Sequence, residues 1–143
     1  MRILFLSMLV FHVVVGVLGI GSIVSVALLA TMARRRRRGT AETFFWLRPL
    51  LRSSGISLGA MLVTGGILDF AMQGAFRSSW WFRGSVLLLL VTGALHGLSR
   101  RAMRTVAVNE ASNDVVLRRV ERIAYAMCVL IVAITVLMVV KPF

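Results

Sequence analysis

Long apolar stretches alternate with short polar segments along this chain of 143 residues. A helix rises about 1.5 Å per residue, so crossing the roughly 30 Å of hydrocarbon in a bilayer takes about 20 apolar residues. Four stretches are long enough, at about residues 3–33, 50–72, 80–98 and 115–140. We therefore predict an all-α fold, a four-transmembrane-helix bundle, with residues 1–143 forming a single integral membrane domain. Strands are not expected, because an unclosed sheet leaves backbone groups unpaired in lipid.

Individual residues near the ends of these stretches predict where the helices begin. The Phe-Phe-Trp run at 44–46 predicts a short interfacial segment in the first loop. Pro49 suits the first turn of the second helix, where a missing backbone N–H costs nothing. Trp80 and Trp81 predict an interfacial anchor at the start of the third helix, and Asn113 predicts the N-cap of the fourth.

Basic residues outnumber acidic ones by 17 to 5, although the chain is 59% hydrophobic and its mean hydropathy is +0.90. Thirteen of the basic residues fall in two loops on one side of the predicted membrane: Arg34–Arg38, Arg48, Arg52, Arg100, Arg101, Arg104, Arg118, Arg119 and Arg122. By the positive-inside rule these loops are cytoplasmic and both termini lie outside, an N-out/C-out topology. We expect a multi-pass protein of a bacterial cytoplasmic (inner) membrane.

The position of the arginines also bears on the partners of the protein. A basic excess can indicate a nucleic-acid partner. Arginines at a membrane surface, however, attract anionic lipid headgroups. We therefore expect membrane lipids as partners, bound through Arg34, Arg35, Arg36, Arg37 and Arg38, and no nucleic acid.

Each predicted helix carries small and polar residues at helical spacing, which in lipid mark the face that packs against other helices. These faces are Met8, His12, Gly16, Gly19 and Ser22/Ile23; Gly55, Gly59, Leu62, Gly66 and Asp69; Ser85, Leu89, Thr92/Gly93 and His96/Gly97; and Glu121, Tyr125, Cys128, Val132 and Thr135. The two G-x-x-x-G motifs among them are explained by helix packing. The ionisable residues inside the predicted bilayer all fall on these faces, so they should point into the bundle.

Three ionisable residues lie well inside the predicted membrane, where they are costly and mark candidate functional sites: His12, Asp69 and His96. Histidines on facing helices hold haem b when their imidazoles lie at the same height. At about 1.5 Å per residue, His12 and His96 differ in height by about 8 to 17 Å. One haem bridging both within a chain is therefore disfavoured, although His12 could bind haem with a methionine or a second subunit.

A soft-metal site is the alternative cofactor site. Met8 and His12 are spaced i, i+4 on one face, and Met72 and Met138 end their helices at the same leaflet. Thioether sulfur and imidazole nitrogen suit Cu(I). Asp69 is placed to orient the His12 ring as a hydrogen-bond acceptor. Methionines also fill gaps in cores, so a packing role for them stays open.

Two of the polar side chains have structural interpretations as well. Asp69 is also placed to pair with Arg83. His96 is expected to have a structural role more than a ligand-binding one, with three candidate neighbours: Tyr125, Thr92 and Glu121.

Three short segments carry a family resemblance: F-H-V-V-V-G-V-L-G-I-G (Phe11–Gly21), T-G-G-I-L (Thr64–Leu68) and M-V-V-K-P (Met138–Pro142). They resemble the small, uncharacterised four-helix family related to CopD-like (copper resistance D) bacterial membrane proteins. The resemblance implies an inner-membrane bundle with copper handling or haem binding by association, and His12 matches the family's histidine in the first helix. Leu18 stands where CopD-like proteins often carry tryptophan, and the extra histidines and helices of the larger copper proteins are absent, which argues against a complete transport activity.

The sequence contains no motif of a hydrolase or an ATPase, so an enzyme acting alone is not expected. The first hypothesis is a haem- or copper-binding accessory protein of a redox or metal-handling system, holding haem b or Cu(I) through His12. The alternative is a structural or assembly subunit of a larger membrane complex, or of a homo-oligomer, with no cofactor of its own.

Overall fold

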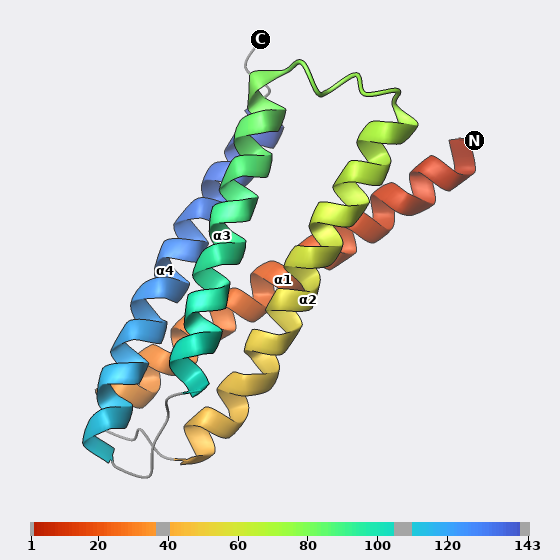
Figure 1. Ribbon diagram of the computed structural model, residues 1–143. Helices are drawn as coiled ribbons and strands as arrows, with labels where there is room; N and C mark the ends of the chain where they lie inside the picture. Colours follow the sequence, from red (N-terminus) through yellow and green to blue (C-terminus); the bar gives the residue numbers. More distant parts are fainter. Residues whose placement is uncertain (1, 37–40, 105–109, 141–143) are drawn as a thin grey trace.

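The computed structural model describes residues 2–36, 41–104 and 110–140, and the regular structure of these residues is entirely α-helical. The helices are α1 (Arg2–Arg35), α2 (Ala41–Ala71), α3 (Trp80–Arg104) and α4 (Glu110–Val140) (Figure 1). Each is long and apolar enough to cross a membrane. The prediction of an all-α chain with four helices of membrane-spanning length is confirmed.

The four helices form a ring in which each one packs against two neighbours. α1 packs against α2 and α4, and α3 packs against α4 and α2. The α2–α3 interface is the smallest of these. Figure 1 shows α3 and α4 side by side. α2 and α3 diverge along their length and are farthest apart at the end where the segment between them connects them. We call the end where α2 ends and α3 begins the open end, and the opposite end the arginine-rich end.

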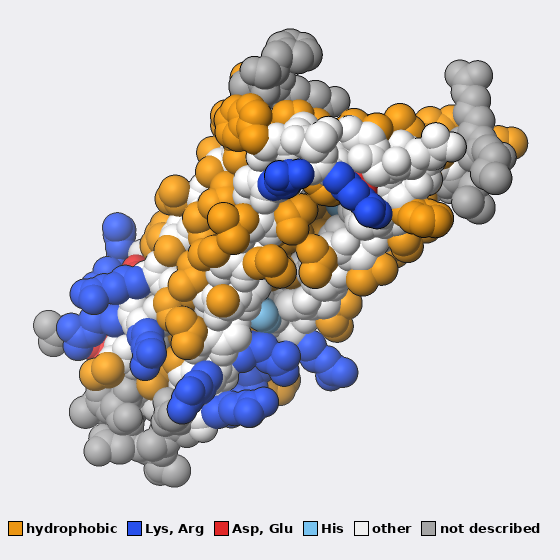
Figure 2. Space-filling view, turned by 45° about the horizontal axis from the view of Figure 1, so that its top comes forward, with side chains coloured by type: hydrophobic (Ala, Val, Ile, Leu, Met, Phe, Trp, Pro, Cys, Tyr) orange, Lys and Arg blue, Asp and Glu red, His pale blue; other side chains and the backbone are white. Residues whose placement is uncertain are grey.

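Charged and apolar side chains are distributed unevenly over the surface. On the face seen in Figure 2, arginine side chains gather at the arginine-rich end, and a broad hydrophobic region separates them from the open end. Large apolar side chains such as Val17, Leu87 and Val129 are exposed on the outside of the helices. An exposed apolar surface of this extent is typical of a protein that faces lipid.

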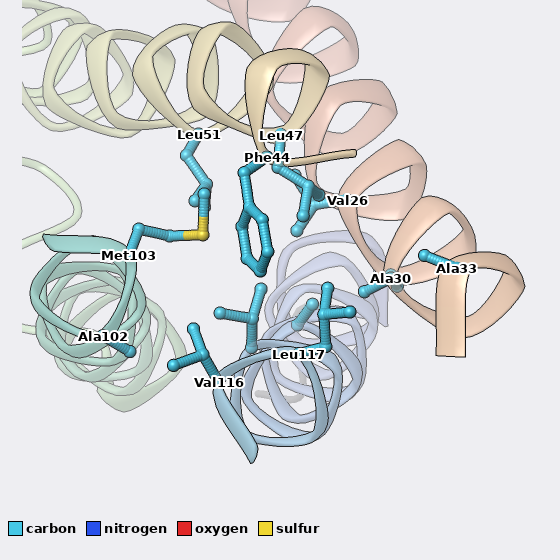
Figure 3. Close-up of a cluster of buried hydrophobic side chains, with 13 residues drawn as sticks. Val26, Ala30, Ala33, Phe44, Leu47, Leu51, Ala102, Met103, Val116 and Leu117 are labelled. Carbon is cyan, nitrogen blue, oxygen red and sulfur yellow. The ribbon is translucent and has the colours of Figure 1, made fainter. Parts of the chain in front are cut away.

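The buried apolar core lies at the arginine-rich end, and all four helices contribute to it (Figure 3). Val26 and Ala30 come from α1, Leu47 from α2, Met103 from α3 and Leu117 from α4. Leu47 and Leu117 are 0% exposed. This end of the bundle is therefore the part in which the four helices are held together most closely.

α2 begins earlier than the sequence predicts, at Ala41 rather than near residue 50. The expected interfacial segment belongs to its first turns. Phe44 is buried and its ring points toward α4 (Figure 3), whereas Phe45 and Trp46 are exposed. Pro49 consequently lies inside the helix and not in its first turn. An interior proline removes one backbone hydrogen bond, and the burial of Phe44 in the core offsets that loss.

α4 also begins earlier than predicted. Asn113 was expected to cap a helix starting near residue 115, but α4 begins at Glu110 and Asn113 is a buried residue within it. The first turns of α4 pack into the core through Val116 and Leu117. These tertiary contacts outweigh the local preference of Asn113 for a capping position. Local sequence signals carry no information about such contacts.

The predicted packing faces are right for some positions and wrong for others. Buried as expected are Gly19, Ile23, Asp69, Ser85, Thr92, His96 and Glu121. Exposed instead are Gly59, Leu62, Gly66, Gly93, Gly97, Tyr125, Val132 and Thr135. Among the described residues, nothing lies within 4 Å of a Cβ atom added at Gly59, Gly66, Gly93 or Gly97. On α2 the buried face runs through hydroxyl residues, Ser54, Ser57 and Thr64, and two of the four glycines of the helix, Gly59 and Gly66, are exposed.

Candidate functional site

A cavity of about 300 Å³ lies at the open end, with all four helices contributing to its wall. Its volume is at the lower end of the range for small-ligand sites. The wall contains three charged or titratable side chains, His12, Asp69 and Arg77, and two thioethers, Met61 and Met138. Its remaining residues are apolar or small. The cavity therefore combines an apolar lining with a few groups able to bind a ligand.

The end of α2 determines where Asp69 lies. The Gly74 N–H donates to the Asp69 carbonyl at 2.9 Å, and the Gln73 N–H donates to the Phe70 carbonyl at 2.9 Å. Gln73 and Gly74 have φ angles of 57° and 74°, the left-handed backbone that this kind of helix end requires. The turn reverses the chain and brings Arg77 back over the last turn of α2. The Asp69 residue is 4% exposed beneath it.

Asp69 pairs with Arg77 and not with Arg83, so that expectation is wrong. Arg77 Nε donates to Asp69 Oδ2 at 2.8 Å, and Arg83 Nε donates to the backbone carbonyl of Arg77 at 2.6 Å. The reversal of the chain after α2 brings the nearer arginine onto the carboxylate, and the farther one supports it. Asp69 Oδ1 is buried without a hydrogen-bond partner among the described residues. Leaving such an oxygen unpaired is costly, and a cation or a ligand donor beside it would remove that cost.

His12 extends from α1 toward α2, where it meets Thr64. His12 Nδ1 lies 2.6 Å from Thr64 Oγ1, and the same hydroxyl donates to the Ala60 carbonyl at 2.7 Å. A hydroxyl has a single hydrogen to donate. His12 is therefore the donor to Thr64 through Nδ1–H, and its Nε2 keeps a lone pair. That nitrogen is the one available to bind a metal.

The methionines at the cavity differ in part from those predicted. Met138 lines the cavity as expected, but Met8 and Met72 are not among the lining residues. Met8 is half-buried one turn before the histidine on α1, and Met72 is exposed beyond the end of α2. Met61, which the sequence analysis did not single out, lines the cavity instead. Its spacing of two helical turns before Asp69 puts both on one face of α2, and that spacing could have identified it.

His96 lies away from the cavity, between α3 and α2. A Cβ atom at Gly55 would stand 2.5 Å from His96 Nε2, and His96 Nδ1 lies 3.4 Å from Ser54 Oγ. His12 instead lies beside Gly65, further along α2. The two glycines are about ten residues apart, or about 15 Å along the helix. The structure thus does not bring His12 and His96 together, and His96 Nε2 faces helix backbone where no iron atom would fit.

Tyr125 was expected near His96 but belongs to a separate polar network between α1 and α4. Its hydroxyl lies 3.1 Å from Thr31 Oγ1, which lies 2.8 Å from Glu121 Oε1. Arg34 Nε donates to Glu121 Oε2 at 2.7 Å. Both carboxylate oxygens of this buried glutamate therefore have partners.

The predicted lipid-binding arginines have different environments. Arg34 is engaged with Glu121, as described above. Arg35 and Arg36 are exposed at the end of α1. Arg37 and Arg38 lie outside the described residues.

Within the described residues, no group of three or more His, Cys, Asp or Glu side chains is placed to hold a metal ion. A metal in the cavity would therefore need thioether ligands as well as imidazole. Comparison with known proteins gives no match, whether to a family model, a curated protein or a solved structure. The resemblance to CopD-like proteins accordingly stays a prediction.

Proposed function

We propose that this protein is a small membrane-embedded accessory protein that holds Cu(I) in the cavity at the open end, serving a metal-handling or redox system. The observation that carries the proposal is that His12, Met61 and Met138 line one cavity. One imidazole nitrogen and two thioether sulfurs are soft, uncharged donors of the kind that Cu(I) prefers.

The hydrogen bonding of His12 supports this proposal. Thr64 accepts a hydrogen bond from Nδ1 and so fixes both the tautomer and the orientation of the ring. Partners of this kind commonly orient histidines that bind metals. The Nε2 lone pair is then ready to bind, and no proton has to leave the imidazole first.

Asp69 adds negative charge to the cavity wall. Arg77 engages Oδ2, while Oδ1 has no partner among the described residues. In surroundings of low dielectric, a nearby carboxylate oxygen stabilises a monovalent cation. We assign Asp69 the role of a charge beside the ion and not of a ligand, because carboxylate oxygen is a hard donor and Cu(I) is a soft ion.

Haem b is less well supported than copper at this site. A haem between two histidines of one chain needs both Nε2 atoms at one height. His96 lies about 15 Å from His12 along α2, nearer the start of that helix, with its Nε2 against Gly55. Haem binding through His12 would need a methionine or a second subunit as the other ligand.

A Cu(I) titration tests the proposal directly. The protein in mild detergent is titrated under reducing conditions against a chromogenic Cu(I) chelator, with elemental analysis of the product. We expect a single Cu(I) per chain. His12→Ala and Met61→Leu each remove one of the three donors, so each should weaken binding by at least about tenfold.

Met8→Leu and Met72→Leu are the matched controls, because each removes a thioether from the same end of the bundle but outside the cavity. Both should bind Cu(I) as the unmodified protein does. Unchanged affinity in His12→Ala, or an equal loss in the controls, would contradict the proposal. An absorption band of the purified protein that shifts on reduction with dithionite would identify haem instead.

We also propose the N-out/C-out orientation in a bacterial cytoplasmic membrane, because most basic residues lie at one end of the bundle. Cysteine labelling in a Cys128→Ser background tests it. Ser78→Cys, in the exposed turn after α2, should react with an impermeant thiol reagent in intact cells. Glu42→Cys, exposed at the start of α2, should react only after permeabilisation. The reverse pattern would overturn the orientation.

The outward-facing glycines favour a second candidate function, that of a structural or assembly subunit. Gly93 and Gly97 form a G-x-x-x-G motif on α3, and no described residue lies within 4 Å of a Cβ added at either. A face of this kind allows another helix to approach closely. Co-purification of metal-free protein with a larger complex, lost on Gly93→Leu, would favour this function over copper binding.

A further inference from the structure

A second hollow, of about 280 Å³, lies at the arginine-rich end between α2 and α3. Two arginines from each helix and two apolar side chains line it: Arg48, Arg52, Arg100, Arg104, Leu51 and Met103. Leu51 and Met103 belong to the buried core, so the arginines surround a hollow whose floor is well packed. Among the described residues that line it, none is acidic.

None of these arginines forms an ion pair with an acidic side chain of the described residues. The ion pairs that the described residues form use Glu121, Asp69 and Asp114, and none of these involves an arginine of the hollow. Several guanidinium groups of like charge around one hollow repel each other. An anion bound among them would remove that repulsion.

The arrangement of the arginines suits phosphate in particular. Arg48 and Arg52 are one helical turn apart on α2, and Arg100 and Arg104 are one turn apart on α3, so each pair shares a face. Guanidinium groups bind phosphate through two parallel N–H donors, a geometry that lysine does not offer. Two such pairs, from facing helices, can contact two phosphate groups at once.

The position of the hollow along α2 indicates where the phosphates come from. Phe45 and Trp46 are exposed about one turn before Arg48, and their rings are in edge-to-face contact with centroids 5.4 Å apart. Exposed aromatic side chains at the end of a membrane-spanning helix lie at headgroup depth. The hollow then lies at the level of lipid phosphates, where basic pockets between helices bind headgroups with several phosphates.

We propose that this hollow is a binding site for a ligand with two phosphate groups, held between the arginine pairs of α2 and α3. The headgroup of cardiolipin, a lipid with two phosphates, offers this chemistry at the right depth, and soluble pyrophosphate offers the same chemistry from the water. The site depends on four particular arginines and not on the net charge of the loops. It is independent of copper binding, because the two cavities lie at opposite ends of the bundle.

The experiment measures binding to the full-length protein in a neutral detergent. The ligands are cardiolipin, phosphatidylcholine and pyrophosphate. Binding of each is measured by native mass spectrometry and by the shift in the melting temperature of the protein. An arginine near such a surface contributes about a fivefold change in affinity, so Arg52→Gln/Arg100→Gln should weaken cardiolipin binding about thirtyfold. Arg52→Lys/Arg100→Lys keeps the charge but loses the paired donors, and its affinity should fall between the two.

The matched control is Arg119→Gln/Arg122→Gln, which removes the same charge from exposed positions outside the hollow. It should change the affinity by less than about twofold, since an exposed charge that does not touch the ligand is weakened by salt screening. Equal losses in the two glutamine variants would overturn the proposal, because net charge would then explain binding. Failure to bind pyrophosphate together with equal binding of cardiolipin and phosphatidylcholine would also overturn it.

Two outcomes support the site and separate the sources of phosphate. Cardiolipin that stays bound in the presence of excess pyrophosphate identifies a lipid site. Pyrophosphate that binds the lipid-free protein and displaces cardiolipin identifies a site for a soluble diphosphate.

Discussion

The two ends of the bundle differ in how completely they are packed. At the arginine-rich end Leu117 is fully buried, and the buried carboxylate of Glu121 has Arg34 on one oxygen and Thr31 on the other. At the open end a cavity of about 300 Å³ remains, and the buried Asp69 has one oxygen without a partner in the described part of the chain. The same kind of residue, a buried acid, is thus satisfied at one end and left half-satisfied at the other.

This difference separates stability from ligand binding. Departures from complete packing and complete hydrogen bonding are expected at functional sites, where the rest of the fold must supply the stability. The core at the arginine-rich end supplies it here. Substitutions of core residues at the arginine-rich end should therefore mainly change the free energy of unfolding, and substitutions in the cavity at the open end should mainly change Cu(I) affinity.

The largest expected effect is the loss of a core side chain at the arginine-rich end. Leu117→Ala should lower the free energy of unfolding by about 2 to 4 kcal/mol, because packing contacts are lost and a void is left. Leu89→Ala, in the wall of the cavity at the open end, should cost less than about 1 kcal/mol, since the site is already hollow and the side chain is only half-buried. SDS titration of the protein in mixed micelles measures both. Equal losses of unfolding free energy in the two variants would contradict the difference in packing between the two ends.

The next effect separates two glycines of one G-x-x-x-G motif. A Cβ atom at Gly55 would stand 2.5 Å from His96 Nε2, whereas a Cβ atom at Gly59 would have no atom of the described part of the chain within 4 Å. Gly55→Ala should therefore cost about 1 to 3 kcal/mol through overpacking. Gly59→Ala should be neutral or stabilising by up to about 1 kcal/mol, from the higher helix propensity of alanine. The same SDS titration measures the free energy of unfolding of both variants. Equal changes in the two would mean that the face of α2 that contacts α3 does not run through Gly55.

Much of the fold could be predicted because it depends on the length and composition of segments. Four apolar stretches predict four helices, and polar positions at helical spacing correctly predict that Ser85, Thr92 and Glu121 are buried. The starts of α2 and α4 were missed, because burial of Phe44 and Val116 in the core extends helices past local signals such as Pro49.

The candidate site could be predicted only in part, for a different reason. Asp69, His12 and Met138 were found because each is a chemically unusual or soft residue near one predicted membrane surface. Arg77 and Met61 were missed. The pairing of Arg77 depends on the left-handed turn after α2, and the position of Met61 depends on which face of α2 meets α1. The turn is not encoded in residue type or spacing. The spacing of Met61 from Asp69 does put both on one face of α2, but it does not say which helix that face meets.

The smallest expected difference in stability, and the sharpest test of the comparison, is between the two buried acids. In Glu121→Gln an amide –NH₂ replaces one of the two carboxylate oxygens that accept hydrogen bonds. Either Arg34 or Thr31 then faces a donor in place of an acceptor. The half-exposed Arg34 can be solvated by water, which limits the cost to about 1 to 2 kcal/mol.

Asp69→Asn can keep its acceptor toward Arg77 and place the –NH₂ where Oδ1 has no partner among the described residues. Because Arg77 is 68% exposed at its side chain, the lost ion pair is weak, and the cost should stay below about 1 kcal/mol. Cu(I) affinity should respond in the opposite order, falling in Asp69→Asn and staying constant in Glu121→Gln. If Asp69→Asn unfolds as readily as Glu121→Gln and binds Cu(I) normally, the open end is packed for stability like the other end, and the half-satisfied carboxylate serves no ligand.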